Sequence, residues 1–146
     1  MFWVILRRMI RKAEKLFVYG TLRRGFPLHR ELAKLDARYI GRGRIGGDLF
    51  NLGEYPGVLP AASSRKGVEG ELYELRKPEE QIPILDQLEE FDAKRPSKSL
   101  FVRRRATVRM NDGSRVRAWV YFLPRRPARA SVISSGDYAE ARRARP

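Results

Sequence analysis

The chain has 146 residues, of which 42% are hydrophobic, and this length and composition suit one globular domain rather than a disordered chain. It contains no cysteine, which excludes disulfides, thiolate metal sites and cysteine nucleophiles. Lysine and arginine number 31 against 17 acidic residues, so the net charge is +14 at pH 7. This balance allows a nucleic-acid partner, but we disfavour that interpretation because general solubility explains the charge equally well and no nucleic-acid motif accompanies it.

Residues 1–15 are basic and partly apolar, and we treat them as an extension that precedes the domain. The apolar run that opens this segment lacks the leading charges and the length of a signal peptide. A membrane-spanning helix needs about 20 consecutive apolar residues, and the sequence contains no such run. We therefore expect a soluble, cytoplasmic protein.

The first regular element expected is a buried strand at residues 16–19, Leu-Phe-Val-Tyr, which stops at Gly20. The loop that follows has glycines spaced like the beginning of a phosphate-binding loop. Phe26 and Pro27 stand where such a loop requires Lys and Ser or Thr, so we reject a nucleotide site of that kind. What remains is a glycine turn after a strand, whose backbone N–H groups can face a small anion such as a carboxylate.

A short helix is expected over residues 28–35, and short β-strands follow it. Glycines and prolines separate these strands, and the segment 54–57, Glu-Tyr-Pro-Gly, predicts a turn between two of them. The last strand alternates with period two, so that Val68 and Leu72 share one face while Tyr73 lies on the other. The expected strands are residues 39–40, 49–52, 57–59 and 68–73.

An acidic helix is expected from Pro78 to about Phe91, because proline is favoured at the first helical position. When its residues are placed at 100° intervals, most of the acidic ones, including Asp86, fall on the solvent side. Glu89 is the exception, since it falls inside the apolar arc of the helix. That arc consists of Ile82, Ile84, Leu85, Leu88 and Phe91.

The position of Glu89 has two interpretations. Burial of a carboxylate costs free energy unless the group is paired or takes up a proton, so desolvation would raise the pKa of Glu89 and suit it to general-base catalysis. The alternative is a structural ion pair with Arg103, Arg104 or Arg105, and helical geometry alone leaves both interpretations open. The single histidine, His29, cannot form a metal cluster alone, so we interpret it as a surface residue or as a residue at the entry to a helix.

The sequence Asn-Asp-Gly at residues 111–113 predicts a tight turn between strands at residues 103–110 and 114–123. Alternate residues of both strands are apolar and form a core face, whereas Tyr121 lies on the opposite face. Many short strands with one or two helices predict an α+β fold with a curved or closed mixed sheet. The core face consists of Ala106, Val108, Met110, Val116, Ala118, Val120 and Phe122.

Five short motifs lie in order along the chain, at residues 16–22, 55–57, 68–73, 85–89 and 135–138. The first contains Tyr-Gly-Thr-Leu, the second is Tyr-Pro-Gly, the fourth reads Leu-Asp-Gln-Leu-Glu and the last reads Ser-Gly-Asp-Tyr. Their order and spacing resemble the gamma-glutamylcyclotransferase-like superfamily. The greatest similarity is to its small bacterial and archaeal members, which are related to gamma-glutamylamine cyclotransferase.

This resemblance implies a gamma-glutamylcyclotransferase-like domain at residues 16–138, followed by a basic tail at residues 139–146. It implies an α+β fold built as a small, mixed, partly closed β-barrel with flanking helices and a pocket at its mouth. It also implies an enzyme that cyclises a gamma-glutamyl amine or gamma-glutamyl amino acid to 5-oxoproline and releases the amine. The alternatives are a non-catalytic module of the same fold that binds a small carboxylate, and a basic protein associated with nucleic acid.

The resemblance also assigns site residues. Glu89 matches the catalytic general acid/base, and the backbone of Gly20, Thr21 and Leu22 matches the loop that holds the gamma-glutamyl group. The resemblance implies neither a metal nor a cofactor. Two tyrosines are further candidates for the substrate site, where each would either line the pocket or simply pack. They are Tyr19 and Tyr121.

The chain departs from the family pattern at three places. Phe101 stands where a tyrosine is common, which removes a hydroxyl group. Glu90 replaces a common glycine directly after Glu89, and its charge would raise the pKa of Glu89 further if the helix ended early. The basic residues 1–15 have no counterpart.

Overall fold

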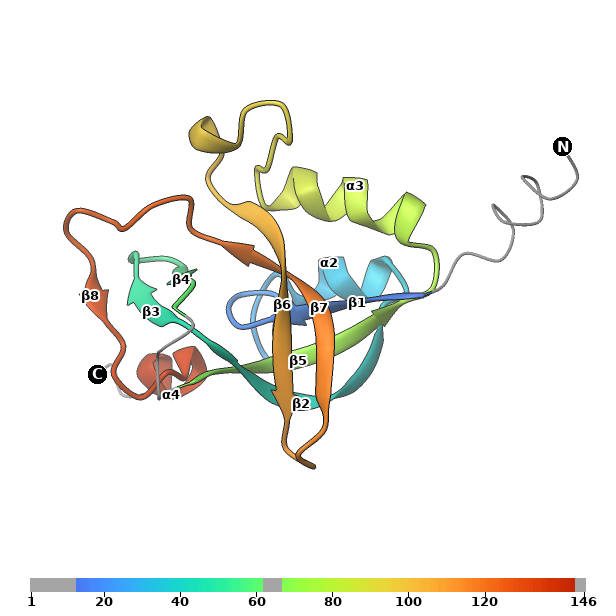
Figure 1. Ribbon diagram of the computed structural model, residues 1–146, viewed down its shortest axis with the longest axis horizontal. Helices are drawn as coiled ribbons and strands as arrows, with labels where there is room; N and C mark the ends of the chain where they lie inside the picture. Colours follow the sequence, from blue (N-terminus) through green and yellow to red (C-terminus); the bar gives the residue numbers. More distant parts are fainter. Residues whose placement is uncertain (1–12, 62–66, 144–146) are drawn as a thin grey trace, which may run out of the picture.

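Five strands close into a barrel in the order β1–β5–β2–β6–β7 (Figure 1). The computed structural model describes residues 13–61 and 67–143. All neighbouring strands pair antiparallel except β1 and β7, which run parallel and meet at Leu16 and Trp119. The barrel strands are β1 (Glu14–Val18), β2 (Arg38–Gly46), β5 (Gly67–Leu75), β6 (Val102–Met110) and β7 (Arg115–Phe122).

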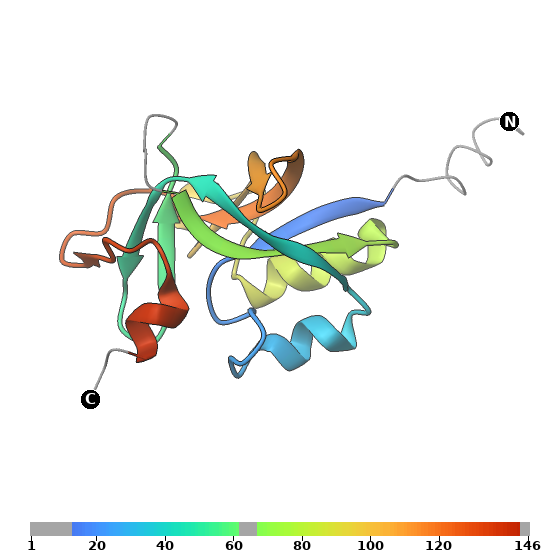
Figure 2. The same ribbon diagram turned by 90° about the horizontal axis from the view of Figure 1, so that it is seen from below.

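A second sheet, in the order β4–β3–β8, lies beside one end of the barrel, and helix α4 lies close to it (Figures 1 and 2). Helices α2 and α3 lie together on one side of the barrel, next to β1 and β5 (Figure 2). None of the helices in the described residues is both long and apolar enough to cross a membrane. These elements are β3 (Asp48–Asn51), β4 (Pro56–Leu59), β8 (Ser131–Val132), α2 (His29–Lys34), α3 (Pro78–Leu88), α4 (Tyr138–Arg143) and a short 3-10 helix η1 (Pro96–Lys98).

Alternation along the barrel strands divides the buried side chains into two cores. In β1, Phe17 points into the barrel, while its neighbour Leu16 belongs to the outer core covered by the two helices. The outer core includes Leu32 of α2 and Leu85 of α3, neither of which is exposed. Both faces of β5 are therefore buried, which the period-two pattern of this strand did not reveal. The inner core also contains Leu72, Val108, Ala118, Val120 and Phe122.

The β6–β7 hairpin confirms the predicted turn and the predicted core face. Backbone hydrogen bonds join the N–H of Met110 to the carbonyl of Ser114 and the N–H of Gly113 to the carbonyl of Met110. Gly113 has a φ of +90°, a conformation that favours glycine. All seven residues of the expected core face pack in the inner core or against it.

Several expected boundaries shift. Strand β2 extends over nine residues where only residues 39–40 were expected, with a register irregularity between Tyr39 and Gly41. Residues 1–12 of the expected N-terminal extension lie outside the described residues, and Glu14 and Lys15 belong to β1. Much of the expected C-terminal tail is helix α4, while residues 144–146 lie outside the described residues.

Gly70 in β5 provides a test of the inner core. A Cβ atom at this position would lie 2.3 Å from the Cζ atom of Phe17 and 2.4 Å from the carbonyl oxygen of Val18. We expect Gly70→Ala to lower the free energy of unfolding by about 2–3 kcal/mol, because the backbone of β1 must move. Denaturant titration measures this loss. Gly41→Ala is the matched control, since its Cβ would meet only the flexible Met110 side chain at 3.3 Å; an equal loss in both variants would contradict the explanation.

Candidate active site

The loop after β1 is a tight turn that packs closely against β4. The N–H of Arg23 donates to the carbonyl of Gly20 over 3.0 Å. A Cβ atom on Gly20 would lie 2.7 Å from the Cγ atom of Pro56, so only glycine allows this approach. The backbone N–H groups of Thr21 and Leu22 donate to no acceptor among the described residues. Both N–H groups are therefore unpaired within the described part of the chain.

The hydroxyl group of Tyr19 connects this loop to two other strands. It donates to the carbonyl of Tyr121 in β7 over 2.6 Å and accepts from the N–H of Val58 in β4 over 3.3 Å. Burial raises the pKa of Tyr19 far above its ordinary value, and the nearby charge of Glu89 raises it further. The phenol is therefore protonated at physiological pH, and its only proton is used within the protein. Tyr19 borders the neighbouring cavity, while its hydroxyl links the loop after β1 to β7 and β4.

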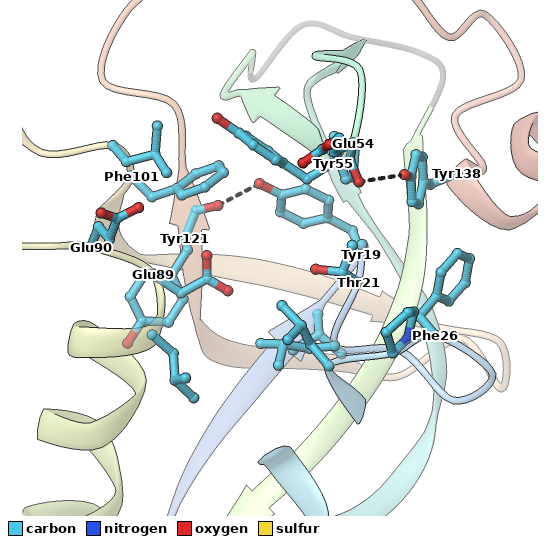
Figure 3. Close-up of a pocket in the computed structure, with 18 of the residues that line it drawn as sticks. Tyr19, Thr21, Phe26, Glu54, Tyr55, Glu89, Glu90, Phe101, Tyr121 and Tyr138 are labelled. Carbon is cyan, nitrogen blue, oxygen red and sulfur yellow. Dashed lines mark hydrogen bonds between the residues drawn. The ribbon is translucent and has the colours of Figure 1, made fainter. Parts of the chain in front are cut away.

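A cavity of about 370 Å³ opens next to this loop (Figure 3). Its volume lies within the usual range of small-molecule sites. Six residues assigned from the sequence line it: Tyr19, Gly20, Thr21, Leu22, Glu89 and Tyr121. The structure thus brings together residues from the loop after β1, from the end of α3 and from β7.

Helix α3 ends at Leu88, three residues before the expected end. The N–H of Phe91 donates to the carbonyl of Asp86 over 2.8 Å, and the N–H of Glu90 donates to the carbonyl of Gln87. Glu90 has a φ of +52°. These bonds and this left-handed residue form a Schellman turn, in which the position of Glu90 usually carries glycine. The turn explains why glycine is common at this position in the family that the sequence resembles. It also makes Glu89 the C-capping residue of α3.

The Glu89 carboxylate has no hydrogen-bond or ion-pair partner among the described residues, and it points into the cavity (Figure 3). No side-chain oxygen or nitrogen in the described ranges is both fully buried and unpaired, so the carboxylate oxygens are accessible from the cavity. Burial raises the pKa of Glu89 from 4.5 to about 7. Desolvation alone accounts for this shift, and the expected contribution of Glu90 is absent.

The alternative of an ion pair between Glu89 and Arg103 or Arg105 is wrong. Arg103 binds Asp86 through two hydrogen bonds of 2.8 and 3.3 Å, and Arg105 binds Glu14 at 2.7 Å. Arg104, the third arginine considered, forms no ion pair with a carboxylate in the described part of the chain. The arginines near the end of α3 therefore leave Glu89 uncompensated.

Asp86 was expected to face solvent, but it lies at the centre of a network beside the cavity. Besides Arg103 it accepts a 2.6 Å hydrogen bond from the hydroxyl of Tyr121. Burial raises the pKa of Tyr121, and its hydrogen bond to Asp86 raises it further. The prediction failed because the contact face of α3 is rotated around the helix axis relative to the apolar arc, toward Asp86 and away from Ile84 and Leu88. Ile84 and Leu88, both assigned to that arc, are 46% and 39% exposed.

Residues 16–140 match the model of the family described as gamma-glutamyl cyclotransferase, AIG2-like. The match covers most of the chain. The protein belongs to this family. The family match and the closed barrel with its flanking helices confirm the resemblance and the fold class inferred from the sequence.

Relatives of known sequence and structure support this membership. The gamma-L-glutamyl-butirosin B gamma-glutamyl cyclotransferase of Niallia circulans is 33% identical over 129 residues, covering 87% of this chain and 71% of that protein. An AIG2-like protein from Mus musculus has a TM-score of 0.64 at 27% identity, over 80% of this chain and 82% of that chain. YkqA from Bacillus subtilis has a TM-score of 0.69 at 30% identity over 90% of this chain, which spans only 41% of YkqA.

The cavity of this AIG2-like family member is also lined by aromatic residues that were not predicted as site residues from the sequence. Phe26 stacks on Tyr138 with ring centroids 5.4 Å apart, and Tyr55 meets Phe101 edge-on at 5.9 Å. The hydroxyl of Tyr138 donates to the carbonyl of Glu54 over 3.3 Å (Figure 3). Two of these residues, Tyr55 and Tyr138, belong to motifs that carried the resemblance, and this was the signal that could have placed them in the site.

A buried ion pair fixes the loop to the C-terminal segment. Arg23, only 4% exposed, donates to the carboxylate of Asp137 over 2.9 Å. Burial by itself would raise the pKa of Asp137, but the hydrogen bond and charge of Arg23, together with the backbone N–H groups of Ala139 and Glu140, lower it below its ordinary value. His29 enters helix α2 as expected, and its Nδ1 atom lies 3.0 Å from the carbonyl of Leu22. Because a carbonyl only accepts, the ring nitrogen donates.

The raised pKa of Glu89 predicts a pH-dependent stability. The folded protein holds the Glu89 proton up to about pH 7, whereas the unfolded chain releases it near pH 4.5. The stability associated with the neutral group is therefore complete below pH 4.5 and is lost as the pH rises to 7. Relative to wild type, Glu89→Gln should gain up to roughly 3 kcal/mol between pH 4.5 and pH 8.

Denaturant titrations of both proteins at these two pH values measure this difference. Glu80→Gln, which removes an exposed carboxylate from the same helix, is the matched control. If Glu80→Gln changed the pH dependence as much as Glu89→Gln, burial of Glu89 would not be its cause.

Proposed function

We propose that this protein is a gamma-glutamylcyclotransferase that converts a gamma-glutamyl amine or a gamma-glutamyl amino acid to 5-oxoproline and releases the amine. The observation that carries the proposal is the unpaired carboxylate of Glu89, whose pKa is raised to about 7 at the wall of a small-molecule cavity. A general base is most effective when its pKa is close to the working pH. The family match and the names of the relatives support the same reaction.

In the proposed reaction, Glu89 removes a proton from the α-amino group of the substrate. The amine nitrogen then attacks the γ-carbonyl carbon of the same molecule, and a carbon–nitrogen bond closes the five-membered ring. Collapse of the tetrahedral intermediate breaks the bond to the leaving nitrogen, which takes the proton back from Glu89. Because the attack is intramolecular, holding the substrate in a folded conformation supplies much of the rate.

The loop after β1 is the proposed holder of the gamma-glutamyl group. The N–H groups of Thr21 and Leu22 have no acceptor among the described residues, so they can donate to a substrate carboxylate or carbonyl oxygen. The close packing of Gly20 on Pro56 fixes the position of the turn. In this arrangement the Tyr19 ring forms a wall of the site.

Asp86 and Tyr121 are proposed to control the electrostatic environment of Glu89. Asp86 neutralises Arg103, the cation that would otherwise be available to Glu89. A guanidinium paired with Glu89 would lower its pKa and weaken it as a base. The hydroxyl of Tyr121 donates to Asp86, so the ring of Tyr121, rather than its proton, faces the cavity.

Replacement of Glu89 tests the reaction. With gamma-glutamyl amines and gamma-glutamyl amino acids as a panel, we expect wild type to release 5-oxoproline. Glu89→Gln should lower kcat by about 10²–10⁴-fold, because one positioned general base contributes that much. Chromatographic measurement of 5-oxoproline gives the rates, and the best substrate identifies the class of leaving amine.

Circular dichroism confirms that Glu89→Gln is folded, and the charge-matched Glu80→Gln should keep the wild-type rate. Binding of a substrate analogue without product formation by any variant would instead support the non-catalytic carboxylate-binding module.

The pH dependence of the reaction provides an independent check. Glu89 must be ionised to act as a base, so kcat/KM should fall about tenfold per unit as the pH drops below about 7. Initial rates between pH 5 and 9 measure this limb, with far-UV circular dichroism at each pH as the control for unfolding. A midpoint near 4.5, the ordinary value of a glutamate, would show that the base is not buried as described.

A further inference from the structure

The tip of the β6–β7 hairpin and the adjacent part of β2 carry an unusual row of arginines. In the strand register Arg44 of β2 lies directly opposite Arg109 of β6, which in turn lies directly opposite Arg115 of β7. All three are exposed. Like charges directly opposite one another destabilise a sheet. The stability of the fold therefore does not explain this row.

Few carboxylates compensate these charges. Arg44 shares Glu69 with Arg42, at 2.8 and 3.1 Å. Arg109 and Arg115 form no ion pair with any carboxylate in the described residues. The same holds for Arg117, whose Nη1 atom donates to the Thr107 hydroxyl over 3.3 Å.

A hollow of about 210 Å³ lies within this row, lined by the side of β2 and by the hairpin. Arg44, Arg109, Arg115 and Thr107 all border it. Guanidinium groups donate in a planar, two-pronged geometry that matches phosphate oxygens, and a hydroxyl can add a further hydrogen bond. The hollow is therefore a suitable seat for one phosphate group, and Arg117 extends the positive charge beyond it.

We propose that this surface, defined as Arg44, Thr107, Arg109, Arg115 and Arg117 and called the basic face, binds the phosphate backbone of a nucleic-acid duplex. Binding relies on phosphate neutralisation and counterion release rather than on base contacts. It is independent of the cyclotransferase proposal, because the residues that line the hollow and those that line the active-site cavity do not overlap. The hairpin tip also lies at the opposite end of the molecule from the η1 loop that follows α3 (Figure 1).

The surroundings of the basic face favour a duplex over other anionic partners. The guanidinium groups of Arg103 and Arg105 lie over the ring of Trp119, an aromatic residue of the hairpin, 4.3 and 4.4 Å from its centroid, and the indole N–H donates to Glu14. Two guanidinium groups already contact this ring, which disfavours stacking on the bases of a single strand. None of the large hydrophobic side chains exposed in the described residues lies in the hairpin, which disfavours membrane insertion.

Binding of a fluorescently labelled 20-base-pair DNA duplex to the full chain, followed by anisotropy between 50 and 200 mM NaCl, tests the proposal. The variant combines Arg109→Gln, Arg115→Gln and Arg117→Gln. The control, with the same loss of charge, combines Lys94→Gln, Arg95→Gln and Lys98→Gln in the exposed loop after α3. We expect the basic-face variant to weaken binding at least tenfold at 100 mM NaCl. It should reduce the slope of log K against log salt by about 2–3, while the control stays within about twofold of wild type.

Four outcomes would overturn the proposal. If wild type did not bind the duplex at 50 mM NaCl, the proposal would be wrong. If the control lost as much affinity as the basic-face variant, the binding would depend on net charge alone. Tighter binding of a labelled 20-nucleotide single strand would reject the duplex, and equally effective competition by poly-L-glutamate would reduce the surface to a general polyanion site. Thermal unfolding checks that the basic-face variant is folded, and its 5-oxoproline release should equal that of wild type.

Discussion

The central constraint of this structure is a carboxylate, Glu89, that stays partly buried and unpaired in a chain with 24 arginines. A guanidinium within hydrogen-bond distance would ionise it and lower its pKa. The fold prevents this by giving the arginines near α3 other partners: Arg103 has Asp86, and Arg105 has Glu14. The Schellman turn then directs Glu89 away from the helix surface and into the cavity. The turn is local to the end of α3, whereas the two ion pairs need β6 in its place.

The barrel brings the remaining parts of the site to the same place. Strands β1 and β7 run parallel at the point of closure, so the loop after β1 and the end of β7 lie at the same end of the barrel. The Tyr19 hydroxyl connects these two strands to β4 through hydrogen bonds on both of its sides. Loss of one partner would leave a buried donor or acceptor unpaired, which costs free energy of folding. The position of the substrate loop is therefore coupled to the packing of the barrel and of the small sheet.

Much of the fold could be predicted from the sequence, because apolar and polar residues alternate along the strands and the turns carry residues typical of turns. The β6–β7 hairpin and its core face could be predicted from the alternation of side chains along both strands and from the Asp-Gly turn. The end of α3 could not be read in this way, because Glu90 occupies a left-handed position that usually carries glycine. Asp86 was misplaced because a helical wheel shows where side chains point but not which strands cover them. The wall contributed by Phe26 could not be predicted, because it depends on a contact with Tyr138 in a distant segment.

The net charge of +14 raises the question of why the pKa of Glu89 is high rather than low. A unit charge 20 Å away contributes only about 0.2 kcal/mol in water before screening, and the Debye length at physiological salt is about 8 Å. Distant arginines, including those of the basic face, therefore have little effect on Glu89. Desolvation acts within the first few ångströms, and Arg103 and Arg105 are paired with Asp86 and Glu14, so the local environment determines the pKa. A chain can thus carry a strongly basic surface at one end and a proton-accepting carboxylate at the other, because screening separates the two.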